Sequence, residues 1–495
     1  MSKSESQGSA VLDRPQIAPR LLFIGGRWVE AQSGKRREVI DPSTGRVITT
    51  VAEGGLADLE AAVAAARKAF DQGDWARMSG RERARILLRV AEVMRRRTDE
   101  LVQTESVDVG KPVTFSRVVD VQTVIEEYEY YAAQAQVREG SFREVPGGAK
   151  AYVCREPLGV IGAITPFNFP LILSNNKLAP ALATGNTIVH KPASETPLSA
   201  LLMAEIFAEA GIPEGVVNVV TGPGSLLGDA MARHPGIDKI AFTGSTEIGR
   251  EVAKVAGEAL KPATLELGGK SAHIIFEDAD IERAVGSVIQ GFIFNTGQFC
   301  MAGTRLLVAR PLHDAVVQAL VGALPQVPLG NPFDPATVVG PMVSAKQRAT
   351  SEEYCRIARE DEKATIAVGG QRIDLDGGFY FQPTVVTGVS NASRLVQEEI
   401  FGPVLTVQAF DSEAEAVALA NSTVYGLAAG LHTRDIGRVH RVASQLKAGI
   451  IWVNSWAILD PSVPFGGYKA SGFGRENGPE VLSYYTQVKS TVIAP

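Results

Sequence analysis

Cysteine is scarce in this chain. Cys154, Cys300 and Cys355 are the three cysteines among 495 residues, and they are widely separated. None of the six histidines stands at a spacing from them that is typical of a metal site. The sequence therefore predicts no metal site, and it favours a reducing compartment.

An excess of positive charge and a long apolar run are also missing. The net charge is -6, with both signs mixed along the chain, so no basic stripe is available for nucleic acid. The chain nowhere offers about 20 uninterrupted apolar residues, and its first twenty residues lack the apolar core of a signal peptide. We expect a cytoplasmic protein with a loose N-terminus and with neither a nucleic-acid nor a membrane partner.

The length of the chain and its apolar pattern indicate an α/β fold. A chain of 495 residues is expected to form about two to three domains. The apolar strands VIGAIT, TIVHKP, VVNVVTG and KIAFTG are each followed by a helical segment, which predicts a parallel sheet covered on both faces. A second α/β unit begins after Glu266. Ligands bind such sheets at the carboxyl ends of the strands, so we expect a cleft between the two units.

The remaining segments predict a helical layer and a projecting arm. Short strands are expected from Leu21 to Val51, followed by helices over residues 57–72, 80–108 and 118–136. Residues 140–158 predict two strands around a Pro-Gly-Gly turn, and the C-terminal SYYTQVKSTVIAP is again typical of a strand. Because unpaired strand edges seek partners, we predict that these two segments form an oligomerisation arm.

Two polar, glycine-flanked turns stand out as candidate chemistry. Glu266 lies in TLELGGKS and Cys300 in NTGQFCMAGTR, and the glycines allow the backbone to approach a ligand closely. A cysteine attacks as its thiolate, and an unperturbed pKa of about 8.5 leaves only a few per cent ionised at neutral pH without help. A nearby carboxylate can accept that proton or activate a water. We interpret the pair as base and nucleophile; the alternative is that Cys300 is a small buried hydrophobe.

Other strand ends carry binding groups. In FTGSTEIG, Gly244 and Ser245 stand between a strand and a helix, where free amides favour a phosphate and suggest a dinucleotide. Lys191 ends another strand and could meet ribose hydroxyls or a phosphate. Asn168, in PFNFP, is an amide whose donation to an oxyanion would lower a barrier by about 3 kcal/mol. One acid of EEIFGPV could hold a ribose.

The motifs together are similar to those of the aldehyde dehydrogenase superfamily. PFNFP, VHKPAS, FTGSTEIG, TLELGGKS, GQFCMAGTR, EEIFGPV, WVNS and PFGGYKASGFGRE occur in the family's order over nearly the whole chain. The resemblance implies NAD(P)+-dependent oxidation of an aldehyde to a carboxylic acid, and a homodimer or homotetramer. It also implies a Rossmann-like NAD(P)-binding domain over 1–139 and 159–265, a catalytic domain over 266–470, and the arm over 140–158 and 480–495.

The resemblance also assigns roles in catalysis. Cys300 is the implied nucleophile, Glu266 the general base, and Asn168 with the Cys300 backbone amide the oxyanion hole. Thiolate addition would give a thiohemiacetal, loss of hydride a thioester, and a water activated by Glu266 would hydrolyse that thioester. Glu266 argues against the coenzyme A-acylating branch, which typically lacks this base.

The resemblance extends to the cofactor. Glu399 and Phe401 match the residues that hold the nicotinamide ribose and ring, Lys191 the adenosine-ribose contact, and Ser245 the pyrophosphate contact. The full set of cofactor-binding residues that we predict is Lys191, Ser194, Gly244, Ser245, Glu399, Phe401, Thr165, Pro166, Phe167 and Gly268.

The cofactor choice depends on one position. Strongly NAD-selective members carry a glutamate three residues after the family lysine, and this chain has Ser194 there. A serine removes the repulsion of a 2′-phosphate and offers a hydroxyl donor, so we predict that NADP+ is accepted, alongside NAD+. Glu195 could swing in and restore the preference for NAD+.

The predicted aldehyde tunnel is apolar. No arginine or lysine flanks Cys300, which disfavours a semialdehyde with a second carboxylate and suits an aromatic or medium-chain aldehyde. The loop WVNSWAILDPSVPFGG is similar to that of phenylacetaldehyde-type enzymes. The residues expected to line the tunnel are Phe169, Ile172, Phe294, Phe299, Met301, Trp456, Leu459 and Phe465.

Several alternatives stay open. Within the family, betaine aldehyde and succinate semialdehyde dehydrogenases are the runners-up. A non-catalytic member would have lost Cys300, Glu266 or Asn168, and none is lost. A cysteine hydrolase unrelated to redox chemistry would need a histidine on the thiol in place of a nucleotide domain.

Overall fold

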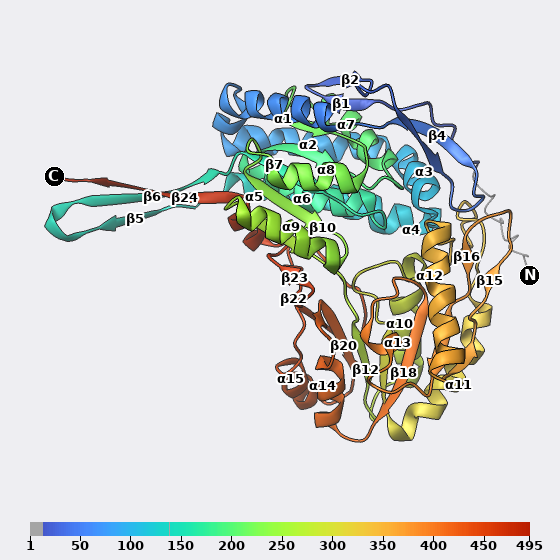
Figure 1. The fold of residues 1–495 in the computed structure, drawn as a ribbon. Helices are drawn as coiled ribbons and strands as arrows, with labels where there is room; N and C mark the ends of the chain where they lie inside the picture. The colour runs from blue at the N-terminus through green and yellow to red at the C-terminus, as the bar shows by residue number, and fades with distance from the viewer. Residues whose placement is uncertain (1–12, 138) are drawn as a thin grey trace, which may run out of the picture.

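Two large β-sheets carry the fold (Figure 1). The structure, a computed structural model, describes residues 13–137 and 139–495. The loose N-terminus predicted from the sequence falls mostly on residues 1–12, outside the described residues. Helices flank each sheet, so the expectation of an α/β fold is confirmed.

The first sheet has eight strands, and its central strands are parallel and buried. Alternate side chains pack on opposite faces: Ile161 and Ala163 of β7 join one hydrophobic core, and Val160 and Ile164 join the other. The strands, in spatial order, are β2 (Arg27–Val29), β1 (Leu22–Ile24), β9 (Val217–Val219), β8 (Thr187–Lys191), β7 (Val160–Ile164), β10 (Lys239–Thr243), β11 (Ala263–Glu266) and β23 (Gly472–Phe473).

Helices cover both faces of this sheet. One face carries α6 (Pro170–Thr184) and α7 (Leu198–Glu209), whose apolar residues join the first core. The other carries α1 (Leu56–Asp71), α8 (Gly224–Arg233) and α9 (Thr246–Glu258). The strand and helix alternation predicted from the sequence is therefore confirmed.

An additional helical layer packs on α6 and α7, and it differs from the prediction in two places. The helix expected over residues 80–108 is broken at Arg97 into α2 (Gly80–Arg96) and α3 (Thr98–Val109). Arg97 leaves helical geometry there, and its side chain pairs with Glu100 and Glu205. The helix expected from residue 118 begins earlier, as α4 (Val113–Phe115) and a π-helical turn (Ser116–Val121), and continues as α5 (Gln122–Gln136).

The second sheet has seven strands, of which the edge strand β14 is antiparallel. Helices α10 (Ile281–Ile293) and α11 (His313–Ala323) cover one face, and α14 (Glu413–Asn421) and α15 (Ile436–Ala443) cover the other. The strands, in order, are β14 (Thr365–Val368), β17 (Thr384–Thr387), β18 (Val404–Phe410), β13 (Arg305–Ala309), β12 (Ala272–Ile275), β20 (Ala428–His432) and β21 (Ile450–Val453).

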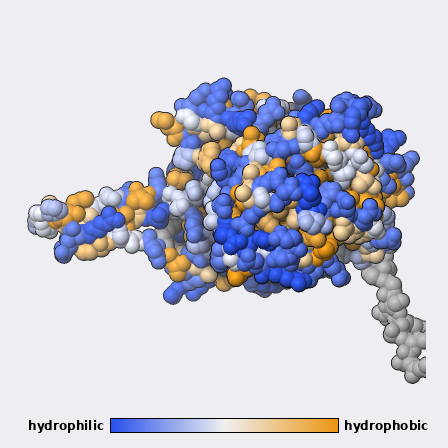
Figure 2. Space-filling model, turned by 90° about the horizontal axis from the view of Figure 1, so that it is seen from below, coloured by the Kyte–Doolittle hydropathy of each residue, from blue (hydrophilic) through white to orange (hydrophobic). Residues whose placement is uncertain are grey.

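A three-stranded arm projects from the first unit (Figure 1). Strands β5 (Ser141–Glu144) and β6 (Lys150–Pro157) form the predicted hairpin, and β24 (Thr486–Ile493) pairs antiparallel with β6. Figure 2 shows hydrophobic residues along this arm; Phe142, Val488 and Val492 are each more than half exposed. The strand pairing agrees with the sequence, and the role of the arm in assembly stays a prediction.

The chain crosses between the two sheets beside β11. Glu266 ends β11, residues 267–271 lead to β12, and β23 returns to pair with β11. None of the helices formed by the described residues is long and apolar enough to cross a membrane.

Candidate active site

Close packing of glycine brings Glu266 and Cys300 into one site. Glu266 is the last residue of β11, and Gly268 and Gly269 turn the chain directly after it. A Cβ on Gly269 would lie 2.2 Å from the carbonyl oxygen of Cys300, so only glycine allows this turn to pack on the cysteine loop. Two segments that are far apart in sequence therefore meet with backbone in contact.

The loop before Cys300 is held in a strained conformation. Asn295, Thr296 and Gly297 have φ values of 47°, 56° and 71° in succession, a left-handed run that is costly for the two non-glycine residues. The side chain of Asn295 donates to the Asn168 carbonyl oxygen at 2.9 Å, and the Thr296 hydroxyl donates to the Gly340 carbonyl oxygen at 3.0 Å. These bonds stabilise a conformation that presents Cys300, and no sequence signal indicated them.

Asn168 faces the same loop from the end of β7. Its Nδ2 donates to the Gln298 carbonyl oxygen at 2.8 Å, which fixes the amide plane. A side-chain amide carries two N–H groups, so one remains for a ligand. Its Oδ1 has no hydrogen-bond partner among the described residues. Asn168 is thus a buried, oriented donor beside the cysteine loop.

Burial and neighbouring carboxylates control the ionisation of the two candidate groups. Glu266 is 3% exposed, and within the described part of the chain neither of its carboxyl oxygens has a hydrogen-bond partner. Burial, and then the charge of Glu476, raise the pKa of Glu266 well above its ordinary value, while Lys177 opposes the shift. Burial also raises the pKa of the Cys300 thiol, with further contributions from Glu399 and Glu266. Both shifts favour the protonated forms of the two groups, a thiol and a carboxylic acid.

A buried ionic network lies beside Glu266. The ammonium of Lys177 pairs with Glu476 and donates to the Thr243 hydroxyl at 2.6 Å. Asn176 donates to the other oxygen of Glu476 at 3.2 Å. This network compensates the buried carboxylate of Glu476, which lies near Glu266.

The residues predicted to hold the nicotinamide end lie together on the other side of the glycine turn. The Gly269 amide donates to Glu399 Oε1 at 2.9 Å, and a Cβ on Gly268 would lie 2.2 Å from Glu399 Oε2. Burial raises the pKa of Glu399 to about 7. Phe401, at a φ of 56°, packs edge-on against Phe167 with ring centroids 5.7 Å apart.

The residues predicted to hold the adenosine and pyrophosphate lie at the strand ends of the first sheet. Lys191 ends β8; its ammonium donates to the Pro192 carbonyl oxygen at 2.9 Å, and burial lowers its pKa to about 8. Ser245 caps α9 and accepts from the Ile248 amide at 3.3 Å, so the helix N-terminus is open to an anion. A Cβ on Gly244 would lie 2.5 Å from the Phe242 ring. The lysine at a strand end and the helix N-terminus beside it fit a dinucleotide, while Gly244 and Gly268 allow Phe242 and Glu399 to pack closely at these turns.

Thr165, Pro166 and Ser194 complete the predicted set of cofactor-binding residues. The Thr165 hydroxyl is hydrogen-bonded to His190 Nε2 at 2.9 Å, and Pro166 is half-buried after β7. The Ser194 hydroxyl donates to the Gly222 carbonyl oxygen at 3.0 Å. This hydroxyl proton is therefore engaged by the protein, which differs from the expectation that it is offered to a 2′-phosphate. Glu195, the next residue, is exposed.

A cavity of about 430 Å³ opens onto Cys300. Aromatic and aliphatic side chains form most of its wall, while Lys and Arg are absent from the lining residues that the structure describes. Asp460 is the one charged side chain among them. The predicted residues that line the cavity are Phe169, Ile172, Phe294, Phe299, Met301, Leu459 and Phe465.

Trp456 differs from the prediction. Its indole stacks on His273 with ring centroids 4.5 Å apart, and a Cβ on Gly303 or Gly430 would lie 3.0 Å or 2.6 Å from it. The glycines leave a slot that the indole fills, so Trp456 packs inside the second unit, and the residues after it, from Ala457 to Pro461, line the cavity.

Sequence reasoning missed another wall of the cavity. Phe115, Val118, Val119 and Thr123 line it from the π-helical region. They precede the first parallel strand and belong to no motif. Only the packing of that helical layer against the cavity reveals them.

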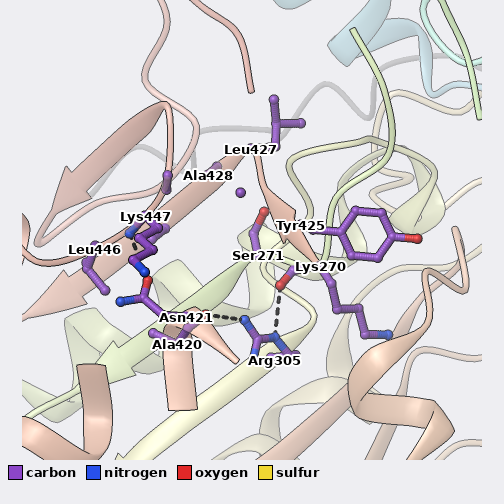
Figure 3. Close-up of a pocket in the computed structure, with 13 residues that line it drawn as sticks. Lys270, Ser271, Arg305, Ala420, Asn421, Tyr425, Leu427, Ala428, Leu446 and Lys447 are labelled. Atoms are coloured by element: carbon purple, nitrogen blue, oxygen red, sulfur yellow. Dashed lines mark hydrogen bonds between the residues drawn. The ribbon is translucent and has the colours of Figure 1, made fainter. Parts of the chain in front are cut away.

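A second hollow near the glycine turn is too small for a substrate. It encloses about 10 Å³, the space of about one water. Figure 3 shows the buried Arg305 beneath Lys270, where it donates to the carbonyl oxygens of Lys270 at 2.9 Å and Ala420 at 2.7 Å. These bonds hold the chain after the turn, so this region supports the site and does not extend it. Across the described chain, no cluster of three or more potential metal ligands occurs.

Comparisons with known proteins agree with this geometry. The model of the aldehyde dehydrogenase family matches residues 28–491. A betaine aldehyde dehydrogenase of Bacillus subtilis is 43% identical over 472 residues, which cover 94% of this chain and 96% of the relative.

Solved structures are equally similar. Betaine aldehyde dehydrogenase from Staphylococcus aureus in complex with NAD+ superposes with a TM-score of 0.94 at 40% identity, covering 96% of this chain and 94% of that one. The NAD+ complex of an aldehyde dehydrogenase from Bacillus cereus has the same TM-score at 44% identity, covering 96% of each chain. The chain belongs to the aldehyde dehydrogenase family.

Proposed function

We propose that this NAD(P)+-dependent aldehyde dehydrogenase oxidises an uncharged aromatic or other hydrophobic aldehyde to the carboxylic acid. The observation that carries the proposal is the wall of the cavity over Cys300: it is aromatic and aliphatic, and its described residues include no cation. An apolar wall favours a substrate that is desolvated at little cost. A semialdehyde with a second carboxylate would find no partner there.

The proposed mechanism uses three side chains of this chain. The Cys300 sulfur adds to the carbonyl carbon and its thiol proton passes to the carbonyl oxygen, which gives the thiohemiacetal; the free N–H of Asn168 and the Cys300 backbone amide donate to that oxygen while negative charge develops on it. The hydroxyl proton of the thiohemiacetal is released when its hydride leaves. NAD(P)+, when bound by Glu399, Phe401, Lys191 and Ser245, supplies the acceptor for the aldehyde hydride. Glu266 then removes a proton from the water that hydrolyses the thioester on Cys300.

The surroundings of Glu266 account for the order of events that we propose. The raised pKa of Glu266 favours its protonated form, which must lose its proton before it can act as a base, so Glu476 and Lys177 control when hydrolysis proceeds. A neutral Glu266 also spares the Cys300 thiolate a like charge at the moment of attack. The proposal thus gives the raised pKa of Glu266 a function.

Betaine aldehyde is the second candidate. Betaine aldehyde dehydrogenases are among the similar proteins, and the only charge on the cavity wall within the described chain is the carboxylate of Asp460. Hydrogen bonds from Ser462 lower the pKa of Asp460, so the group is ionised at neutral pH. A carboxylate beside aromatic rings is the chemistry that a quaternary ammonium requires.

One experiment separates the two candidates. Formation of reduced cofactor should be measured with phenylacetaldehyde, benzaldehyde, betaine aldehyde, succinate semialdehyde and acetaldehyde, for the wild type and for Asp460→Asn. We expect the highest kcat/KM with the aromatic aldehydes, and no change on substitution. If betaine aldehyde is preferred and Asp460→Asn lowers its kcat/KM by about tenfold, the second candidate replaces the first. Preference for the semialdehyde would contradict both.

We also propose that the enzyme accepts NADP+ alongside NAD+ and that the arm joins subunits into a homodimer or homotetramer. No carboxylate occupies the position of Ser194, and the exposed apolar residues of β5, β6 and β24 form a surface suited to a partner copy. Light scattering of the full chain, and of a variant with Val488 and Val492 changed to Asp, tests the assembly. The cytoplasmic location stays a prediction.

A further inference from the structure

A buried ion cluster lies behind the wall of the substrate cavity. Lys111 stands in the turn between α3 and α4, and its side chain is fully buried. Its ammonium lies 2.5 Å from Asp120 Oδ1 and 3.4 Å from Glu105 Oε1. Glu105 also accepts from the Ser199 hydroxyl at 2.6 Å. The cluster plays no part in the chemistry at Cys300.

The same ammonium contacts the cavity wall. It lies 3.9 Å from the centroid of the Phe169 ring, a close cation–π contact in a fully buried site. Phe169 lines the cavity and directly follows Asn168. It is also the N-cap of α6, with φ −139° and ψ 64°: its carbonyl oxygen accepts from the Leu173 amide at 2.9 Å, while the position of its ring depends on side-chain packing.

Asp120, the acid that contacts Lys111, belongs to a second part of the cavity wall. Asp120 belongs to the π-helical turn Ser116–Val121, whose Val118 and Val119 line the cavity. Such π-turns cost backbone energy and persist where surrounding contacts hold them. Burial raises the pKa of Asp120 to about 8, and the ammonium of Lys111 opposes that shift. Asp120 Oδ2 has no hydrogen-bond partner among the described residues, so the contact of Oδ1 with Lys111 is what ties this turn to the ammonium.

A third contact ties the Lys111 turn to the cysteine loop. A Cβ on Gly340 would lie 2.1 Å from the Gly110 carbonyl oxygen, and the Gly340 carbonyl oxygen accepts from Thr296 at 3.0 Å. The turn is therefore anchored to the segment that presents Cys300. A shift of Lys111 would move the two walls relative to the nucleophile.

We propose that Lys111 is a positioning residue that determines which aldehydes the cavity accepts, because its ammonium holds Phe169 and the Asp120 turn in fixed relation. A large aldehyde contacts both walls, so its binding depends on their relative position, whereas acetaldehyde reaches only the base of the cavity. The inference rests on the proposed function, since it assumes that aldehydes occupy this cavity.

The test compares two aldehydes in Lys111→Met, which keeps the length of the side chain and removes its charge. We expect the ratio of kcat/KM for phenylacetaldehyde to that for acetaldehyde to fall about tenfold, mainly through KM, with NAD+ affinity unchanged. The double variant Lys111→Met/Asp120→Asn removes the ammonium together with the acid that contacts it, so it tests the same loss without leaving a buried carboxyl group unpaired at Asp120.

Lys239→Met is the matched control. Lys239 is also a buried lysine, 4.9 Å from the centroid of the Tyr485 ring, and it donates to the Thr264 hydroxyl at 2.9 Å, away from the cavity wall. Its loss should lower the melting temperature and leave the ratio unchanged. A double-mutant cycle with Phe169→Leu should show that the two effects on the ratio are not additive.

The outcomes are distinguishable. If Lys111→Met and the double variant reduce stability but lower kcat/KM equally for both aldehydes, or if the cycle is additive, the inference is wrong. If the wild type itself oxidises acetaldehyde but no aromatic or other large aldehyde, the proposed substrate class fails instead.

Discussion

Replacing Asn168 by alanine separates oxyanion stabilisation from folding. The structure predicts two losses. The free N–H of the amide disappears from the site, and removal of one oxyanion donor is worth about 10²–10³ in rate. The Gln298 carbonyl oxygen loses its donor at 2.8 Å but keeps the Asn295 side-chain amide at 3.3 Å, and loss of one such bond costs about 1 kcal/mol of folding free energy. Asn168→Ala should therefore remain folded while kcat/KM falls by about 10²–10³.

A neighbouring asparagine provides the control. Asn175 lies on α6, the helix that follows Asn168, and is fully buried; it donates to the Leu171 carbonyl oxygen at 2.7 Å and accepts from the Tyr128 hydroxyl at 2.6 Å, but it does not line the cavity. Asn175→Ala should destabilise the fold by about 1–3 kcal/mol and leave kcat/KM within a few-fold of the wild type.

Single-turnover kinetics with saturating NAD+ and urea unfolding of the same preparations measure the two quantities. We expect Asn168→Ala to lose far more activity than its small loss of stability explains, and Asn175→Ala to lose at least as much stability while it keeps its activity. If Asn168→Ala lowers kcat/KM by less than about tenfold, the amide is not the oxyanion donor and serves only to hold the cysteine loop.

The remaining predictions concern the base and the cofactor. Glu266→Gln should form the thioester but hydrolyse it about 10²-fold more slowly, so mass spectrometry should detect an acylated Cys300; an unchanged steady-state rate would remove Glu266 as base. Because burial and Glu476 raise the pKa of Glu266, the hydrolysis rate should increase with pH through a midpoint well above the ordinary carboxyl range. Glu476→Gln should move this midpoint to lower pH, and an unmoved midpoint would contradict the assignment. Ser194→Glu should raise KM for NADP+ far more than for NAD+, whereas equal effects would contradict the cofactor argument. Gly268→Ala places a Cβ 2.2 Å from Glu399, so calorimetry should show weaker NAD+ binding, with the fold retained; unchanged affinity would mean that Glu399 does not hold the cofactor.

Local patterns in the sequence predicted the elements of the fold well. The buried strands VIGAIT, TIVHKP and KIAFTG are apolar throughout because both faces of their sheet are covered, and that pattern is readable without coordinates. The break at Arg97 was not readable, because no proline or glycine stands there and the side-chain contacts of Arg97 with Glu100 and Glu205 are visible only in the structure.

The sequence by itself determined the family and the candidate chemistry. Cys300, Glu266 and Asn168 stand in short motifs whose glycine, proline and polar residues satisfy local backbone requirements, so their pattern is visible in one dimension. The same holds for the hairpin over residues 140–158, whose turn and alternation are local.

Tertiary structure decided what those residues touch. Trp456 does not line the cavity, because distant glycines leave space in the second unit for its indole. The Ser194 hydroxyl donates to a carbonyl oxygen of another loop. Phe115 and the π-helical turn form a wall of the cavity, and Lys111 stands behind Phe169, only because a helical layer from the start of the chain packs there. Burial, charge pairing and side-chain direction are properties of contacts between remote segments, and no local pattern specifies them.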